Sequence, residues 1–199
     1  KGAGEKGASV VFSVRPSEEH GFSFKAKRDY RDLLAMRYAK GVKGFPAICA
    51  CGKANSISHS QQCVMGGFVG QRHNEVANLW GYTCKKVYND VGVEPELEEL
   101  DSEEMERKTA NVTDEARSDV RVRGFWSNRR NAFFDFRVFY PFASSHYGRS
   151  LAAIYKSNSL EKKRQYQERV AQVEDGSFTP MVMSSAGGMG PEIYDHRVQ

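Results

Sequence analysis

Residues 132–140 read AFFDFRVFY, and this stretch decides the fold because it is apolar apart from Asp135 and Arg137. In a strand, alternate residues share a face, so Asp135 and Arg137 lie side by side on one face while the other face is wholly apolar. An aspartate in so apolar a strand is costly unless something pairs with it. The stretch therefore predicts a buried strand that carries a polar site.

A second acidic residue, Asp119, falls on the preceding predicted strand at residues 117–126. A hairpin turn centred on residues 127–128 sets Asp119 opposite about residue 136 and makes it a neighbour of Asp135, with Cβ atoms about 5 Å apart if the two share a face. Two carboxylates at this distance repel unless a cation or a proton lies between them. Mg²⁺ prefers one or two carboxylates with water and phosphate oxygens, so the pair predicts a magnesium site for phosphodiester hydrolysis.

The carboxylate pair also has a structural interpretation. Asp135 could pair only with Arg137, or with Arg121 on the neighbouring strand, since ion pairs are the usual way to bury a charge. A magnesium site and a buried ion pair are both compatible with the pattern of these two strands.

Lys162 lies on the inward face of a predicted helix, four residues before Tyr166. Such a lysine can reach a site at the sheet edge and stabilise the charge on a phosphate in the transition state. It can also extend its ammonium group to solvent from the end of an apolar stripe. The neighbouring Lys163 lies about 100° further round the helix, and with Arg164 the two lysines suit a phosphate backbone.

Three of the four cysteines, Cys49, Cys51 and Cys63, lie close together in the sequence with His59 among them. In a chain with no sign of secretion, this clustering favours a metal site over disulfides. Three thiolates and one imidazole match a closed tetrahedral zinc site, although the Cys-x-Cys pair is closer than usual and scattered free thiols are the alternative. Cys84 lies in a predicted helix and is expected to be a small buried hydrophobic residue.

The remaining segments place these sites in an α/β protein. After the cysteine segment the order is helix, three strands, helix and strand, which suggests helices on both sides of a small mixed sheet. The acidic run at residues 94–106 is expected to be a solvated connection. The predicted elements outside the two acidic strands lie at residues 27–39 (helix), 72–88 (helix), 91–97 (strand), 151–155 (the start of a helix), 159–175 (a stronger helix capped by Ser159) and 178–184 (strand).

The composition suits one sizeable domain, or one domain with a small module. A hydrophobic content of 40% and an aromatic content of 12% exclude wholesale disorder. No apolar run is long enough to span a membrane, and no apolar signal core follows the N-terminus. The 29 basic and 25 acidic residues leave a net charge of +4, which permits a polyanionic partner without arguing for one. The first residue is not Met, so we expect a piece of a longer protein.

Several short motifs follow one another in a fixed order along roughly residues 22–190. They are Cys49-Ala-Cys51-Gly, His59-xxx-Cys63, Gly66-Gly67-Phe68, Arg72-His73-Asn74-Glu75, Glu94-Pro95-Glu96, Asp119 with Gly124-Phe125-Trp126, Phe133-Phe134-Asp135-Phe136-Arg137-Val138, Lys162-Lys163-Arg164-Gln165-Tyr166, and Ser177-Phe178-Thr179-Pro180 leading to Gly187-Gly188. This order resembles the restriction-enzyme-like endonuclease region at the C-terminal end of site-specific non-LTR retrotransposon polyproteins, and that of related reverse-transcriptase-like proteins. The joint order is far more specific than any single motif.

The resemblance implies a restriction-endonuclease-like core of the PD-(D/E)xK type (helix, three strands, helix, strand), preceded by a small zinc knuckle and an N-terminal helix. The implied domains are residues 1–45, 46–70 for the knuckle, 71–190 for the nuclease and 191–199 for a truncated tail. It also implies Mg²⁺-dependent nicking of target DNA that primes reverse transcription. The implied partners are DNA, the element RNA and an upstream reverse transcriptase domain, with action in the nucleus and no membrane.

By position, the resemblance assigns roles to individual residues. Tyr166 would support the site. Beside these roles, Glu75 and His73 lie at the start of the helix after the knuckle, where Glu75 could supply a third carboxylate and His73 could contact a phosphate or pack near the knuckle. The implied catalytic residues are Asp119, Asp135, Arg137, Lys162, Lys163, Tyr166 and Glu75, with Asp119 and Asp135 as Mg²⁺ ligands and Lys162 or Lys163 as the catalytic lysine. The nucleic-acid-binding candidates are Arg72, His73, Arg121, Arg123, Arg129, Arg130 and Arg164, and the implied Zn²⁺ ligands are Cys49, Cys51, His59 and Cys63.

Two departures from the family pattern bear on activity. Ser118, not proline, precedes Asp119, and Arg137, not lysine, stands two residues after Asp135. Arginine is always charged and cannot act as a base, but it can clamp a phosphate. Three functions therefore follow from the sequence: an active endonuclease, an inactive nucleic-acid-binding module with the nuclease fold, and a zinc-stapled interaction domain without a nucleic-acid role.

Overall fold

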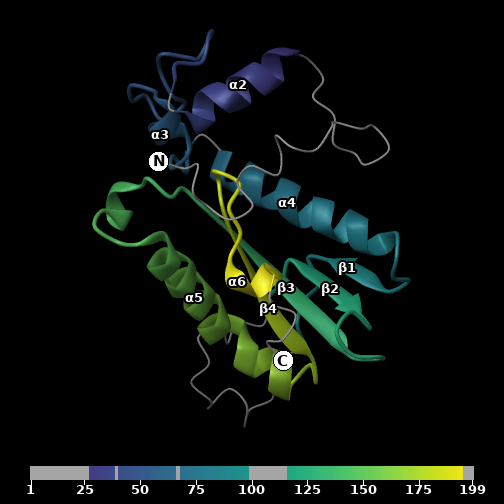
Figure 1. The fold of residues 1–199 in the computed structure, drawn as a ribbon. Helices are drawn as coiled ribbons and strands as arrows, with labels where there is room; N and C mark the ends of the chain where they lie inside the picture. The colour runs from purple at the N-terminus through teal and green to yellow at the C-terminus, as the bar shows by residue number, and fades with distance from the viewer. Residues whose placement is uncertain (1–26, 39, 66–67, 99–115, 195–199) are drawn as a thin grey trace. The chain divides into compact units, whose positions relative to one another are not determined.

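A computed structural model of the chain describes residues 27–38, 40–65, 68–98 and 116–194 (Figure 1). The chain divides into two compact units. The first unit comprises residues 1–70, 139–147 and 184–189, and the second comprises residues 71–138, 148–183 and 190–199. The cysteine cluster belongs to the first unit and the acidic strands belong to the second.

The second unit is built on a four-stranded sheet with the order β1-β2-β3-β4. β1, β2 and β3 are antiparallel neighbours. The strands are β1 (Val91–Val93), β2 (Val120–Arg123), β3 (Asn131–Phe139) and β4 (Ser177–Ser184), and the helices that accompany them are α4 (Phe68–Lys85), α5 (Leu151–Gln172) and the short α6 (Pro191–Tyr194).

β4 runs in the same direction as β3. Gly176, just before β4, lies against the carbonyl of Asn131 at the start of β3. Ser185, just after β4, donates its N–H to the carbonyl of Phe139 at the end of β3, at 2.8 Å. The sheet is therefore mixed, with α5 as the crossover between its two parallel strands.

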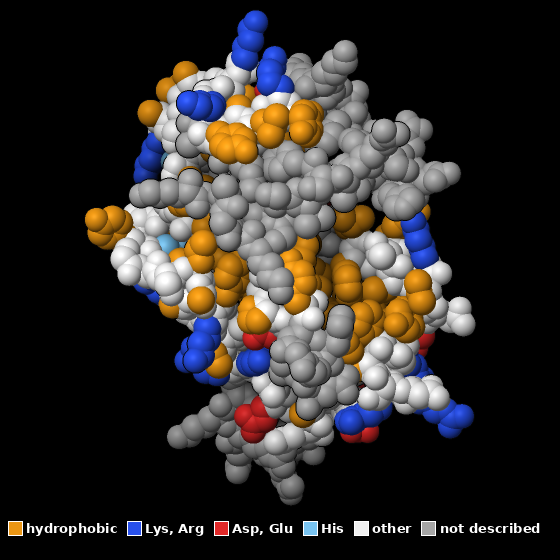
Figure 2. Space-filling model, in the orientation of Figure 1, with side chains coloured by type: hydrophobic (Ala, Val, Ile, Leu, Met, Phe, Trp, Pro, Cys, Tyr) orange, Lys and Arg blue, Asp and Glu red, His pale blue; other side chains and the backbone are white. Residues whose placement is uncertain are grey.

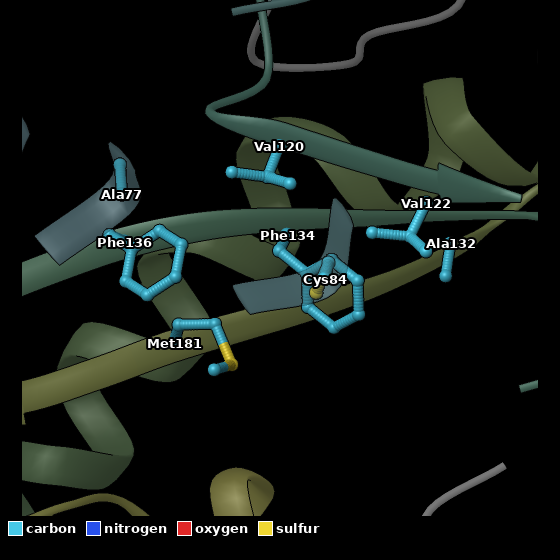
Figure 3. Close-up of a cluster of buried hydrophobic side chains, with 8 residues drawn as sticks. All are labelled: Ala77, Cys84, Val120, Val122, Ala132, Phe134, Phe136 and Met181. Atoms are coloured by element: carbon cyan, nitrogen blue, oxygen red, sulfur yellow. The ribbon is translucent and has the colours of Figure 1, made fainter. Parts of the chain in front are cut away.

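Two long helices pack on opposite faces of this sheet (Figure 1). α4 covers the face where Cys84 meets Phe134 and Phe136 in one buried cluster (Figure 3). α5 covers the other face, where Val170 packs with Phe133. The alternation of β3 thus sends its aromatic rings into two separate cores, and the predicted α/β arrangement of helices around a small mixed sheet is confirmed.

The region after β3 differs from the prediction in one respect. A single helix, α5, replaces the predicted pair, and its N-cap is Ser150, whose Oγ accepts a hydrogen bond from the N–H of Ala153 at 3.2 Å. Ser159 is not a cap but lies buried in the middle of the helix. The neighbouring Asn158 is accommodated within the helix, where it donates its side-chain N–H to the carbonyl of Ile154 at 2.8 Å.

The predicted strand at residues 117–126 is shorter in the structure and corresponds to β2. Gly124 has a φ of 83° and opens the turn toward β3, a conformation that glycine adopts without strain. The aromatic residues that follow leave the strand and pack on Phe134, with Phe125 at 4.9 Å and Trp126 at 6.5 Å between ring centroids. Their place is in the core of the α4 face and not in the β-ladder.

The other predicted elements of the second unit occur with shifted ends. The helix predicted at residues 72–88 is α4, which begins at Phe68 and ends at Lys85, where Tyr88 donates its N–H back to the carbonyl of Cys84 at 2.8 Å. The strand predicted at residues 91–97 is limited to β1 and an isolated bridge between Glu96 and Arg117.

One edge of the sheet is short, and the other is covered at its C-terminal end. β1 is the edge on one side and has three residues. At the other edge the chain turns back along β4, where Ser184 donates its N–H to the carbonyl of Gly188 and Gly190 donates its N–H to that of Val182, both at 2.8 Å. Gly190 allows this approach, because a Cβ there would lie 3.1 Å from the carbonyl oxygen of Val182.

The first unit contains α2 (Lys27–Arg37), α3 (Ile57–Ser60) and a 3₁₀ helix, η4 (Ser144–His146). The helix predicted at residues 27–39 is confirmed as α2. The acidic run lies outside the described residues from Glu99 onward. Among the described helices, none has the length and apolar character needed to cross a membrane.

Candidate metal centre and candidate active site

The first two predicted zinc ligands lie on a tight loop of the first unit. Ile48 and Ala54 form an isolated antiparallel bridge that closes this loop. Within it, Cys49 donates its N–H to the carbonyl of Lys53 at 2.9 Å, and its own carbonyl accepts the N–H of Gly52 at 2.8 Å. A loop of this kind has few apolar contacts of its own and is typical of a segment stapled by a metal.

The other two ligands follow on α3. Ser56 caps this helix and accepts a hydrogen bond from the N–H of His59 at 3.0 Å, and Cys63 donates its N–H to the carbonyl of His59 at 2.8 Å. The Sγ atoms of Cys49 and Cys63 are 3.6 Å apart, and Sγ of Cys51 lies 3.2 Å from Nε2 of His59. All four ligand atoms lie within 4.8 Å of one another.

These separations suit zinc. Zn–S bonds of about 2.3 Å and Zn–N bonds of about 2.0 Å in a tetrahedron give ligand–ligand distances of roughly 3.5–3.8 Å. The four residues are therefore close enough to bind one metal ion, and the donor set is that of structural zinc. Within the described residues this is the only group of three or more histidine, cysteine and acidic side chains placed to hold a metal. Cys84 is separate from it, and burial raises the pKa of its thiol to about 11.

In the second unit, Asp119 lies at the start of β2, and each of its carboxylate oxygens has a hydrogen-bond partner. The ladder pairs Val120 with Phe134, so continuing this antiparallel register by one residue sets Asp119 opposite Asp135. Oδ2 of Asp119 accepts the backbone N–H of Phe136 at 2.5 Å, and Oδ1 lies 3.0 Å from Nε2 of His73. The side chain of Asp119 therefore replaces a backbone acceptor where the β2–β3 ladder ends.

Asp135 lies in the middle of β3 and is only 3% exposed. Its Oδ2 lies 2.5 Å from Nζ of Lys162, which comes from α5 across this face of the sheet. Burial raises the pKa of Asp135 to about 6, even though the charge of Lys162 acts in the opposite direction. One lysine therefore does not fully compensate the buried carboxylate, because the charge of Asp119 also disfavours ionisation.

His73 reaches the same cluster from the first part of α4. Its ring is half-buried, and the hydrogen bond with Asp119 raises the pKa of His73 against the opposing effect of burial. Because a carboxylate only accepts hydrogen bonds, Nε2 of His73 carries a proton in this contact. The adjacent Arg72 is also half-buried, and its Nη2 donates to the carbonyl of Val138 on β3 at 3.4 Å.

The structure separates the remaining catalytic candidates. Tyr166 lies near the cluster, with its ring centroid 5.8 Å from Nζ of Lys162. Lys163 points instead toward Glu192, 3.4 Å away. Arg137 is exposed. Glu75 is also exposed and accepts a hydrogen bond from Gln71 at 3.1 Å. It lies about 200° around the helix from His73 and therefore outside the cluster.

Several arginines predicted to bind nucleic acid are engaged in the fold. Arg121 contacts Asp90 at 2.6 Å and Arg130 contacts Asp175 at 2.8 Å. Arg164 donates to the carbonyl of Leu160 within its own helix, while Arg123 and Arg129 are exposed. On the face drawn in Figure 2, Lys and Arg occur in small separate groups, several of them beside acidic side chains.

Some contacts of the cluster were not predicted from the sequence. The pairing of His73 with Asp119 joins residues 46 positions apart. Outside the cluster, the contact of Lys163 with Glu192 was not predicted either. Ser118, where the family pattern has proline, is 1% exposed and donates its Oγ–H to the carbonyl of Phe134 at 2.9 Å. The signal in the sequence was a serine next to the acidic residue of a predicted strand, since a buried hydroxyl needs a hydrogen-bond partner.

The sequence was also compared with known proteins. No protein-family model and no curated protein matches it.

Proposed function

We propose that the second unit is a Mg²⁺-dependent endonuclease of restriction-endonuclease-like fold that cleaves phosphodiester bonds in DNA. The observation that carries this proposal is the proximity of Asp119 and Lys162 to Asp135, since Lys162 contacts Asp135 and the charge of Asp119 acts on it. The three residues come from β3, α5 and the start of β2. A purely structural ion pair needs only one carboxylate and one cation, whereas this cluster holds a second carboxylate beside them.

Magnesium fits the residues present. Mg²⁺ is held by one or two carboxylates together with waters and substrate phosphates, and Asp119 with Asp135 supplies that number. The pKa of Asp135 is raised to about 6 despite the ion pair with Lys162, so the cluster is short of positive charge. A divalent cation bound there would activate water and stabilise the leaving oxygen of a phosphodiester.

The chain's own residues would assist the reaction in three ways. The ammonium group of Lys162 would stabilise the negative charge that develops on a phosphate oxygen. Tyr166 would keep Lys162 in place, because its ring stacks on Phe178 at 5.5 Å and limits the lysine to the space above the sheet. The packing of α5 against this face would exclude bulk water from the buried side of Asp135.

The wider biological role rests on the motif order. The resemblance to retrotransposon endonuclease regions supports nicking of target DNA to prime reverse transcription, with an upstream reverse transcriptase domain and the element RNA as partners in the nucleus. The zinc knuckle of the first unit would then help to hold target DNA or RNA.

One observation favours the second candidate function, a nucleic-acid-binding module that keeps the nuclease fold without its chemistry. Each carboxylate of the cluster already has a side-chain partner, since His73 contacts Asp119 and Lys162 contacts Asp135. Because ion pairs with side chains are the usual way to bury a charge, these contacts do not require a metal ion.

Cleavage of supercoiled plasmid in the presence of Mg²⁺ tests the proposal. We expect the native chain to nick the plasmid and Asp135→Asn to lower the rate at least roughly 100-fold, about 3 kcal/mol of transition-state stabilisation. The matched control is Asp175→Asn, which makes the same change at an exposed surface ion pair and should leave nicking unchanged.

Two results would contradict this proposal. A native chain that binds DNA with a steep salt dependence but does not nick it would support the binding module and contradict the endonuclease. Nicking that persists in Asp135→Asn would remove the cluster from the reaction.

A further inference from the structure

The carboxylate of Asp119 is held from two sides by groups that come from different elements. The backbone N–H of Phe136 fixes Oδ2 from β3, and the imidazole of His73 contacts Oδ1 from α4. The main chain of Asp119 is fixed as well, because its carbonyl accepts the N–H of Glu94 at 2.8 Å. With His73 absent, the carboxylate would keep one hydrogen bond and could turn about it.

His73 is itself held firmly on α4. The neighbouring Arg72 donates to the carbonyl of Val138, so this part of the helix is tied to β3, the strand that also carries Asp135. The side chain of His73 is 31% exposed and that of Asp119 is 17% exposed, which leaves the contact partly shielded from water. A charge-assisted hydrogen bond in such surroundings is stronger and more directional than one on the open surface.

We propose that His73 is a positioning residue that holds Asp119 in the orientation required to bind a divalent cation. The proposal rests on the proposed function, because it assigns Asp119 as a metal ligand. His73 acts through Asp119 and not on the phosphate, so its role differs from that of a nucleic-acid contact. Hydrogen-bond partners of metal-ligating carboxylates typically change metal affinity or activity by about 10–100-fold when they are removed.

Binding of Mn²⁺ alone, followed by the loss of its free-ion electron paramagnetic resonance signal, tests this role without relying on activity. The full chain is used with its knuckle loaded with zinc. We expect His73→Ala to weaken Mn²⁺ binding about 10–100-fold. We expect His73→Gln to restore most of the affinity, because the glutamine amide N–H can reach the position of the imidazole Nε2–H.

Two controls keep the result specific. His146→Gln changes a histidine of the first unit, whose Nδ1 lies 3.1 Å from the carbonyl of Tyr140, and should leave Mn²⁺ binding unchanged. Thermal unfolding of each variant shows whether the fold is intact, and His73→Gln provides a second variant should His73→Ala fail to fold.

The outcomes separate this inference from the proposed function. Equal Mn²⁺ affinity in the native chain and His73→Ala, or no recovery in His73→Gln, would overturn the positioning role while plasmid nicking by the native chain still stands. A native chain that binds no Mn²⁺ would overturn both.

Discussion

The zinc-type cluster and the carboxylate cluster are assembled in opposite ways. The four ligands of the knuckle come from residues 49–63, one short stretch of chain, and their ligand atoms lie within 4.8 Å of one another. The carboxylate cluster draws on α4, β3, α5 and the start of β2, and each of its acids meets a cationic or protonated side chain. A local cluster is fixed by its loop, whereas a distributed one is fixed by the packing of the whole sheet.

This difference has an energetic meaning. Within residues 46–65 only Cys49 and Cys63 are buried, so a bound metal ion would supply the stability that a core would otherwise give. The carboxylate cluster is supported by two buried aromatic cores and instead lowers the stability of the fold, because its charges are desolvated. Each region can therefore be perturbed separately, and the predictions follow from the largest expected effect to the smallest.

Removal of one thiolate should have the largest effect. Structural zinc contributes about 10–16 kcal/mol of binding free energy in zinc-finger peptides, so Cys49→Ser should lower zinc affinity by several orders of magnitude. Zinc content after dialysis against a weak chelator measures this loss, with Cys84→Ala as the control that removes a thiol outside the cluster. One zinc per chain retained in Cys49→Ser would contradict the assignment of the ligands.

The same experiment sharpens the comparison between the regions. Hydrogen exchange in the chelated protein should rise across residues 46–65 and stay low across β2 and β3, because the sheet has its own core. A parallel rise in the strands would show that the two regions fold as one unit.

Substitution of Lys162 by methionine should have the next largest effect. It leaves Asp135 buried without its cation, and breaking a buried ion pair in this way costs about 3–5 kcal/mol of unfolding free energy. Urea denaturation at pH 7 measures the change. Lys163→Met is the matched control, because Lys163 contacts the partly exposed Glu192 at the longer distance of 3.4 Å. Similar losses in the two variants would show that Asp135 does not depend on Lys162.

The smallest effect is the pH dependence that Asp135 imposes. Its pKa rises from 3.8 to about 6 on folding, so between about pH 4 and pH 6 the folded state keeps a proton that the unfolded state has released. The unfolding free energy should therefore fall as pH rises through this window, by at most about 3 kcal/mol. Asp135→Asn should remove this slope in denaturation curves measured from pH 4 to pH 7, and an unchanged slope would assign it to other groups.

The order of the strands and helices and the inward direction of Lys162 could be predicted from the sequence. The ion-pair partner of Asp135 could not: the expected partners were Arg137 and Arg121, but Arg137 is exposed and Arg121 contacts Asp90. Lys162 takes their place, 2.5 Å from Asp135.

The alternation in residues 132–140 predicts which rings enter which face, and the helical spacing of Lys162 and Tyr166 predicts that the lysine points inward. Both follow from local geometry. Contacts between α4 and β2, such as His73 with Asp119, depend on how a helix is placed over a sheet, and no local pattern contains that information.

The register of the β2–β3 hairpin was also predicted with an error of one residue. The prediction set Asp119 opposite about residue 136, whereas the observed register continues to residue 135 because the turn is centred on Ser127. Gly124 donates its N–H to the carbonyl of Arg130 at 2.8 Å and defines a wider turn than a two-residue hairpin. The helix after β3 was divided wrongly for a related reason, since a serine in mid-helix looks like a cap until its burial is known.

The return of the chain along β4 has a consequence for how the molecule behaves in concentrated solution. An open strand edge is a template on which another molecule can add a strand and begin to aggregate. Here the outer side of β4 is occupied by residues 188–190 of the same chain, and the opposite edge, β1, is too short to offer a long template. Gly190 favours this arrangement, because a Cβ there would lie 3.1 Å from the carbonyl oxygen of Val182 and the return segment would have to shift to accommodate it.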